Sequence, residues 1–170
     1  MSEDELEVML SSLKGVHDGG EIVDEFSHAL QCAAHALGAG ASRELVAAAL
    51  LHDVGRSPLL ADEKGMPHEA MAARWLLPRF GERVAWLAGA HVIAKLHLLR
   101  TEPGYLATLS QESARSAKLQ KVDAIAAPLE HPWWPEALRL RLWDDAAKDP
   151  DSPLPDPGVA LAVVQPIRIL

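Results

Sequence analysis

Three features are scarce or missing in this 170-residue sequence, and each excludes a class of protein. Cys32 is the only cysteine, which excludes a disulfide framework and a thiolate zinc cluster and is typical of a reducing compartment. Lysine and arginine number 16 against 24 acidic residues, so the formal net charge of -8 leaves no basic face for nucleic acid. No apolar run approaches the roughly 18 residues of a membrane span, and the N-terminal MSEDELEVML does not have the order of a signal peptide. We therefore expect a soluble, cytoplasmic protein that acts on a small molecule, with neither nucleic acid nor a membrane as partner.

The length and the apolar pattern predict one helical domain with a tail. The chain is long enough to bury a core, and apolar residues recur with the helical period between glycine and proline breaks, without convincing paired strands. The expected helices cover residues 2–13, 22–37, 45–55, 68–80, 82–99, 111–126 and 135–147. The fold class is therefore all-α, with the domain at residues 1–150. The proline-rich tail at 151–170 is expected to pack on the body or on a partner, and a homodimer is one option.

The most informative stretch is LVAAALLHDVG at residues 45–55. Its first seven residues are apolar on every side of a helix, which predicts a buried helix. Gly55 is a natural residue at which to leave that helix. His52 and Asp53 thus lie at the end of a buried helix, where a carboxylate needs a partner. A metal cation is the simplest such partner.

Residues that can bind a metal ion are spread over five of the expected helices, as in helical bundles that build an internal metal site. The candidates are His28, His52, Asp53, His68, His91 and Asp144. Taken alone, His28 or His68 is more often a surface or structural histidine, whereas the buried His52-Asp53 pair is a strong signal. Imidazole and carboxylate ligands leave iron, manganese, zinc or cobalt as candidate metals. The other histidines, at positions 17, 35, 97 and 131, are expected to play no part in the site.

The spacing of these residues resembles the HD-domain superfamily, whose signature is an early His, a His-Asp pair and a late Asp. Here these are His28, His52-Asp53 and Asp144, and His68 and His91 are what a two-metal version adds. The resemblance implies an HD-domain helical bundle with a dinuclear metal site in its core. An adjacent His-Asp pair suits such a site, because the imidazole can serve one ion while the carboxylate bridges two ions about 3.5 to 4 Å apart.

Further stretches carry a narrower resemblance over most of residues 18 to 150. They are HALQCA at 28–33, LVAAALLHDVG, the segment from His91 to Gln120, and RLRLWDDAAK at 139–148. Together they resemble the HD-domain mixed-valent diiron oxygenases of organophosphonate degradation, which are related to myo-inositol oxygenase. That family implies two iron ions, Fe(II) and Fe(III), held by the six candidate ligands, with Asp53 between them and with His52 and Asp53 at the catalytic centre. It also implies O2 as co-substrate.

The same resemblance assigns residues to the substrate. Lys95 lies four residues after His91, on the same helical face, and would hold a phosphonate oxygen. Arg141, three residues before Asp144, faces the same way. The segment that closes over the phosphonate contains Ser113, Ser116 and Gln120.

One stretch departs from the family pattern. Those oxygenases have a Tyr-Gly-Gly-Glu type stretch before the first His, whereas this chain has Asp18-Gly19-Gly20-Glu21. Glu21 would receive an amino or quaternary ammonium group of the substrate. Asp18 stands where the tyrosine caps the open iron position. Because the two glycines give the loop no stiffness, we expect water rather than Asp18 at that position.

The leading interpretation is an O2-dependent diiron oxygenase that oxidises a small organophosphonate, amino- or ammonium-bearing, at the carbon next to phosphorus. Either hydroxylation or cleavage of the C–P bond could follow. The runner-up is an HD-domain metal-dependent phosphohydrolase, in which the same residues activate water toward a phosphate ester. A third option is a catalytically silent metal- or ligand-binding protein. The presence of all six ligands together with Lys95 argues against that option.

Overall fold

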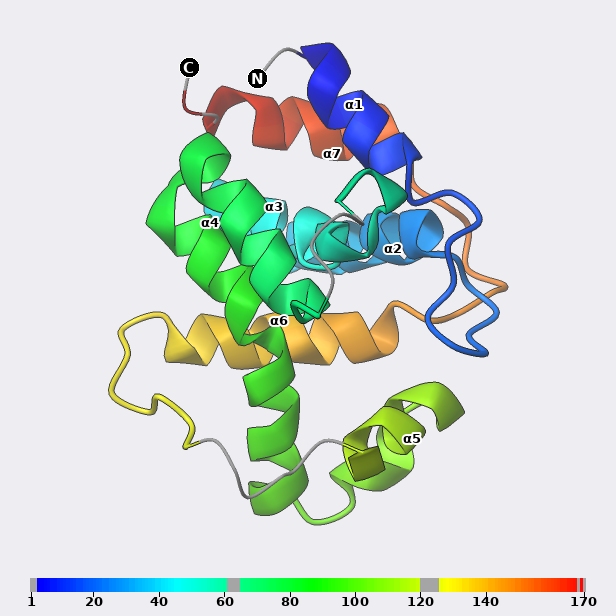
Figure 1. Ribbon diagram of the computed structural model, residues 1–170, viewed down its shortest axis with the longest axis vertical. Helices are drawn as coiled ribbons and strands as arrows, with labels where there is room; N and C mark the ends of the chain where they lie inside the picture. Colours follow the sequence, from blue (N-terminus) through cyan, green and yellow to red (C-terminus); the bar gives the residue numbers. More distant parts are fainter. Residues whose placement is uncertain (1–2, 61–64, 120–125, 168, 170) are drawn as a thin grey trace.

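The structure is a computed structural model that describes residues 3–60, 65–119, 126–167 and 169 (Figure 1). The described part is helical and contains no strand, which confirms the all-α prediction. The α-helices are α1 (Glu3–Ser11), α2 (Glu25–Gly38), α3 (Arg43–Leu51), α4 (His68–Thr101), α5 (Gln111–Leu119), α6 (Trp134–Ala146) and α7 (Pro157–Val164). None of the helices in these residues is both long and apolar enough to cross a membrane.

Helix α3 is the centre of the bundle, as its apolar sequence predicted. Every residue from 45 to 51 is at most 1% exposed, and helices α2, α4, α6 and α7 all pack against it. Its N-terminus is capped by Ser42, whose side chain accepts a hydrogen bond from the Leu45 N–H at 3.3 Å. Burying one leucine or valine side chain contributes roughly 1.5–3 kcal/mol. The segment that ends in His52 and Asp53 is therefore firmly anchored.

Gly55 has a different role from the one predicted. Helix α3 ends at Leu51, and a 3-10 turn (Val54–Arg56) follows. Gly55 is not among the residues with a positive φ, so it is not a left-handed cap. Instead, a Cβ atom on Gly55 would lie 2.0 Å from the backbone oxygen of His68. The missing side chain lets this turn pack directly on the first residue of α4, which brings Asp53 close to His68.

The prediction that the second helix starts at Ile22 is wrong. Asp24 is the N-cap of α2, and its carboxylate accepts a hydrogen bond from the Ser27 N–H at 2.8 Å. Ile22 is 77% exposed rather than part of the core face. Residues 15–24 therefore form a loop that leads into α2.

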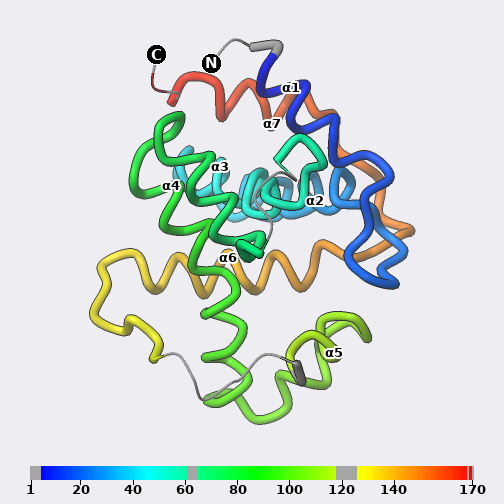
Figure 2. Tube along the Cα trace, viewed as in Figure 1, coloured from blue at the N-terminus to red at the C-terminus, as the bar shows by residue number. Residues whose placement is uncertain are grey.

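Helix α4 corresponds to the two helices predicted at 68–80 and 82–99. Its halves meet at Gly81, whose φ of 82° lies in the left-handed region that glycine adopts without strain. One half carries His68 and the other carries His91. Figure 2 follows the chain from the end of α4 through a turn into α5, away from the end of the molecule formed by α1 and α7. The helix predicted at 111–126 begins as α5 (Gln111–Leu119). Residues 120–125, which include the predicted site residue Gln120, lie outside the described residues.

The C-terminal tail contains a helix that the sequence pattern did not predict. Asp156 caps α7 by accepting a hydrogen bond from the Gly158 N–H at 2.9 Å, and Pro157 occupies the first turn. Ala160, Leu161 and Val164 are buried, and α7 packs on α3 and α2.

Candidate metal centre

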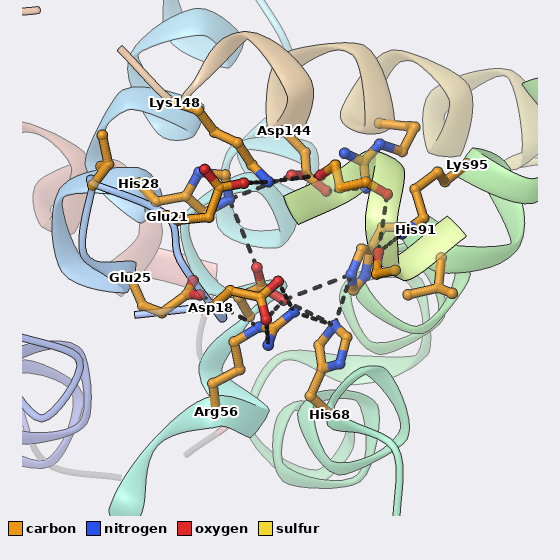
Figure 3. A pocket seen from close by; sticks show the side chains of 16 residues that line it. Asp18, Glu21, Glu25, His28, Arg56, His68, His91, Lys95, Asp144 and Lys148 are labelled. Atoms are coloured by element: carbon orange, nitrogen blue, oxygen red, sulfur yellow. Dashed lines mark hydrogen bonds and ion pairs between the residues drawn. The ribbon is translucent and has the colours of Figure 1, made fainter. Parts of the chain in front are cut away.

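The residues predicted to bind metal come together around one cavity of about 220 Å³ inside the bundle (Figure 3). They come from four helices: His28 from α2, His52 and Asp53 from the end of α3, His68 and His91 from the two halves of α4, and Asp144 from α6. All of them except His52 line the cavity, and His52 lies behind them with no exposed surface.

The side chains form two clusters that share Asp53. In the first cluster, the Nε2 atoms of His28 and His52 lie 3.2 Å apart, and Oδ2 of Asp53 is 3.7 and 3.4 Å from them. Asp144 adds Oδ1 at 3.4 Å from His28 Nε2 and Oδ2 at 3.6 Å from His52 Nε2. This cluster offers two imidazoles and two carboxylates to one point.

The second cluster uses the other oxygen of Asp53. The Nε2 atoms of His68 and His91 lie 3.2 Å apart, and Oδ1 of Asp53 is 3.2 Å from the first and 3.6 Å from the second. Each oxygen of Asp53 thus faces a different histidine pair, which is the arrangement that a carboxylate between two ions requires.

Hydrogen bonds to the backbone fix which nitrogen is free in three of the four imidazoles. The Nδ1 atoms of His28, His52 and His91 lie 2.9, 3.0 and 2.6 Å from the backbone oxygens of Ala147, Ala49 and Ala88. A carbonyl oxygen only accepts, so Nδ1 must donate, and Nε2 of the neutral ring carries a bare lone pair. Two such lone pairs at 3.2 Å repel each other unless a cation lies between them. The donor set therefore fits metal ions, and backbone partners of this kind are how proteins orient histidine ligands.

The environment of Asp53 also fits a bound metal ion. Its Oδ1 atom is buried and has no hydrogen-bond partner within the part of the chain that the structure describes, a costly state for a carboxylate oxygen. Burial acts to raise the pKa of Asp53, but Arg56 and His52 outweigh it and hold that pKa well below its usual value. Burial likewise opposes ionisation of Asp144, and Arg141 overrides it and keeps the pKa of Asp144 low. Both carboxylates are therefore ionised, as metal binding requires.

The electrostatics of the histidines differ between the clusters. Burial would lower the pKa of His52, but Asp53 and Asp144 raise it above its ordinary value. The two carboxylates therefore favour a positive charge at this position. Burial holds the pKa of His91 well below its ordinary value, helped by His52 and His68 against the opposing effect of Asp53. His91 is thus neutral and available as a ligand.

Arg141 faces the cavity, but two carboxylates occupy its guanidinium group. Nη1 lies 2.6 Å from Asp144 Oδ2, Nε donates to Asp145 Oδ2 at 3.1 Å, and Nη2 also donates to Asp145. The Tyr105 hydroxyl donates to the same Asp145 at 2.5 Å. Arg141 thus orients Asp144, and the predicted contact between Arg141 and a phosphonate stays a prediction.

Lys95 lies beside the second cluster and is available for an anion. Its Nζ atom donates to Ser116 Oγ on α5 at 2.9 Å. Burial and the nearby Arg141 lower the pKa of Lys95 to about 8. Ser113 also lines the cavity, and its hydroxyl accepts a hydrogen bond from Lys148 at 2.9 Å. Helix α5 therefore contributes Ser113 and Ser116 to the cavity wall, and its closing over a phosphonate stays a prediction.

The loop that contains the departure from the family pattern is held by two half-buried cations, Arg56 and Lys148. Arg56 donates to both carboxylate oxygens of Asp18 at 2.9 and 3.0 Å. Lys148 donates to Glu21 Oε1 at 2.9 Å, and the Ser110 hydroxyl donates to the same oxygen. Asp18 is therefore engaged by Arg56, and whether water fills the position that a tyrosine caps in the family stays a prediction.

Arg56 and Glu25 are among the residues on the cavity wall that sequence reasoning missed. Glu25 is only 4% exposed, and burial together with the nearby Asp53 raises its pKa to about 8. The spacing held a signal for both residues. Glu25 lies three residues before His28 and Arg56 lies three residues after Asp53, so each is one helical turn from a candidate ligand.

The histidines that were expected to play no part do not line the cavity. His17 and His35 are exposed. His131 stacks on Trp86 with 3.7 Å between ring centroids, and His97 packs edge-on against Trp134. Their positions agree with the prediction that they have structural or surface roles.

Comparison with known proteins identifies the class first. Residues 26–142 match the HD domain family model, so the chain belongs to the HD-domain family. The chain is 38% identical over 149 residues to the hydroxymethylphosphonate dioxygenase of Gimesia maris, an alignment that covers 80% of this chain and 73% of that protein. It is 31% identical over 147 residues to the [1-hydroxy-2-(trimethylamino)ethyl]phosphonate dioxygenase (glycine-betaine-forming) of Leisingera caerulea, over 81% of this chain and 75% of that protein.

These relatives narrow the class. Within the HD-domain family, the chain belongs to the group that contains phosphonate dioxygenases, as the sequence resemblance implied. It is an enzyme of the O2-dependent oxygenase type. The two histidine and aspartate clusters indicate that this enzyme works with metal.

Proposed function

We propose that the protein is a diiron oxygenase that oxidises a small organophosphonate at the carbon next to phosphorus, using O2. The observation that carries the proposal is the pair of histidine clusters that share Asp53, placed beside a buried lysine in a cavity of about 220 Å³. The names of the two relatives support both the substrate class and the use of O2.

The candidate ligands divide between two iron ions. His28, His52 and Asp144 would hold one ion and His68 and His91 the other, with Asp53 contributing an oxygen to each. A mixed-valent Fe(II)/Fe(III) pair would supply the redox chemistry with O2, which the side chains of this chain cannot supply alone. The protein's part is to keep the Nε2 atoms bare, the carboxylates ionised and the ligands out of bulk water.

Lys95 is the group best suited to bind the phosphonate. The cavity is also lined by Arg56, Arg141 and Lys148, and each of these lies within 4 Å of a carboxylate: 2.9 Å for Arg56 and Asp18, 2.6 Å for Arg141 and Asp144, and 2.9 Å for Lys148 and Glu21. Among the described residues no carboxylate pairs with Lys95, which donates a hydrogen bond to the Ser116 hydroxyl. Its charge is therefore free to balance an incoming anion.

The experiment that tests this function compares iron-loaded with zinc-loaded protein. An oxygenase needs iron, so the iron form should consume O2 in step with product when given hydroxymethylphosphonate or a 2-amino-1-hydroxyethylphosphonate. The zinc form should bind these compounds without turning them over. Release of inorganic phosphate would distinguish C–P cleavage from hydroxylation. Anaerobic hydrolysis of a phosphate ester by the zinc form at a comparable rate would overturn the proposal in favour of a phosphohydrolase.

A further inference from the structure

Glu25 presents a buried carboxylate oxygen to the cavity that nothing satisfies. The side chain is 4% exposed and lines the cavity, and its Oε2 atom has no hydrogen-bond partner among the residues that the structure describes. Its Oε1 atom lies 3.5 Å from Arg56 Nε, which likewise lacks a hydrogen bond. A buried acceptor in this state destabilises the free protein until a donor reaches it.

The other acidic residues on this side of the cavity are already satisfied. Glu21 accepts hydrogen bonds from Lys148 and Ser110, so Lys148 neutralises its charge. Both oxygens of Asp18 accept hydrogen bonds from Arg56. Glu25 is therefore the acid of this group that offers a free acceptor.

Arg56 cannot satisfy Glu25, because other carboxyl groups compete for the same guanidinium group. This one guanidinium group lies within 4 Å of three carboxylates: 2.9 Å from Asp18, 3.5 Å from Glu25 and 3.3 Å from Asp53. One guanidinium group is thus shared by three carboxyl groups and leaves Glu25 without a hydrogen-bond donor, whereas Lys95 lies on the opposite side of the cavity (Figure 3). A small molecule whose phosphonate binds at Lys95 would direct its other end toward Glu25.

We propose that Glu25 receives a hydrogen-bond donor, a primary ammonium or hydroxyl group, at the end of the substrate away from the phosphonate. The sequence resemblance gave this role to Glu21, which is instead paired with Lys148 as part of the cavity wall. The inference rests on the proposed function for the phosphonate end. A quaternary ammonium group has no hydrogen to donate, so it would leave Oε2 of Glu25 unsatisfied. A primary ammonium group would also favour the ionised form of this buried carboxyl group.

Three ligands of nearly equal size test the assignment: 2-aminoethylphosphonate, 2-hydroxyethylphosphonate and ethylphosphonate. They differ only in the terminal group, and their affinities for the iron-loaded protein can be measured by anaerobic calorimetry without turnover. The wild-type protein should bind the amine roughly tenfold or more tightly than ethylphosphonate, with the alcohol in between, as expected for a charge-assisted hydrogen bond. In Glu25→Gln and Glu25→Ala most of the advantage of the amine should disappear, while ethylphosphonate still binds.

The matched control removes the neighbouring ion pair as a unit. Substituting Glu21→Gln alone would leave Lys148 unpaired and repel any ammonium group, so the control combines Glu21→Gln with Lys148→Met. This double variant should keep the preference for the amine. Loss of the preference in the double variant, or an unchanged preference in both Glu25 variants, would overturn the assignment.

A further measurement needs no variant, so misfolding of the Glu25 substitutions cannot hide the answer. The wild-type protein should bind 2-aminoethylphosphonate roughly tenfold more tightly than its N-trimethyl derivative, and equal affinities would contradict the proposal. If none of these phosphonates binds, the proposed function itself fails, and the inference fails with it. Binding of ethylphosphonate without any preference for the amine would reject the role of Glu25 alone.

Discussion

The two halves of the candidate metal centre differ in how far the protein encloses them. In the half formed by His28, His52 and Asp144, the side chains are 5%, 0% and 5% exposed. In the other half, His91 is only 3% exposed but His68 is 21% exposed, and His68 borders Arg56 at 22%, which is paired with Asp18 at 38%. The enclosed half is suited to holding an ion permanently, whereas the open half is where a substrate can enter.

The difference has a local cause in the sequence. His52 directly follows α3, whose side chains are buried on every side, and its Nδ1 atom is tied to that helix through the Ala49 carbonyl. His68 is the first residue of α4, directly after Pro67, and its Nδ1 atom lies 3.2 Å from the carboxylate of its neighbour Glu69. The residues around His52 are buried, whereas Pro67 is exposed and residues 68–70 are half-buried, so the second half stays more accessible.

Replacing Asp53 with alanine should disrupt both halves of the centre at once, because Asp53 is the residue that they share. We expect Asp53→Ala to lose both metal ions and all oxygenase activity. It should also lower the free energy of unfolding by about 3 kcal/mol or more, since the bound ions no longer stabilise the folded protein. Elemental analysis and urea denaturation measure the two effects. A nearly normal metal content in this variant would reject the bridging assignment.

The second prediction sets one half against the other. His52→Ala creates a cavity at a site with no exposed surface, so the metal-free variant should lose about 2 kcal/mol or more of unfolding free energy. His68→Ala removes a partly exposed side chain and should cost under about 1 kcal/mol in the same assay. Using metal-free protein keeps the stabilisation by bound ions out of the measurement. Equal losses in the two variants would mean that the halves are enclosed to the same degree.

Lys95 belongs to the open half but should bind substrate without binding metal. Lys95→Ala should keep both metal ions and weaken phosphonate binding by about 1.5–3 kcal/mol. The pKa of Lys95 is lowered to about 8, so its ammonium form is present below that pH and is lost as the pH rises through it. Wild-type affinity should therefore fall above about pH 8, whereas Lys95→Arg should stay charged and lose this step. An unchanged affinity in Lys95→Ala would return this lysine to a structural role.

The smallest effect is expected at the edge of the open half. The Asp18 carboxylate is 38% exposed, so its ion pair with Arg56 is partly screened by water. Asp18→Asn should retain both metal ions and change the free energy of unfolding by less than about 1 kcal/mol. A loss of metal from Asp18→Asn would show that this carboxylate supports the second cluster directly.

The enclosed half was also the more predictable of the two. An uninterrupted apolar run before His52 requires a buried helix, and this constraint is local, so α3 and the His52-Asp53 pair followed from the sequence. The environment of Glu25 and Arg56 did not, because their partners come from distant segments: Arg56 and Asp18 are 38 residues apart. The start of α2 was misplaced because the cap at Asp24 was not recognised, and α7 was missed because its apolar run has no polar face. A homodimer and a cytoplasmic location stay predictions.

The most direct test of the central claim is an EPR spectrum, recorded with elemental analysis, of protein isolated from iron-supplemented cells. If Asp53 joins the two halves into one centre, the protein should contain two iron ions per chain and show the signal of an exchange-coupled Fe(II)/Fe(III) pair. That signal should be absent in Asp53→Ala. One metal ion per chain, or two iron ions without magnetic coupling in the mixed-valent state, would contradict the shared-carboxylate account.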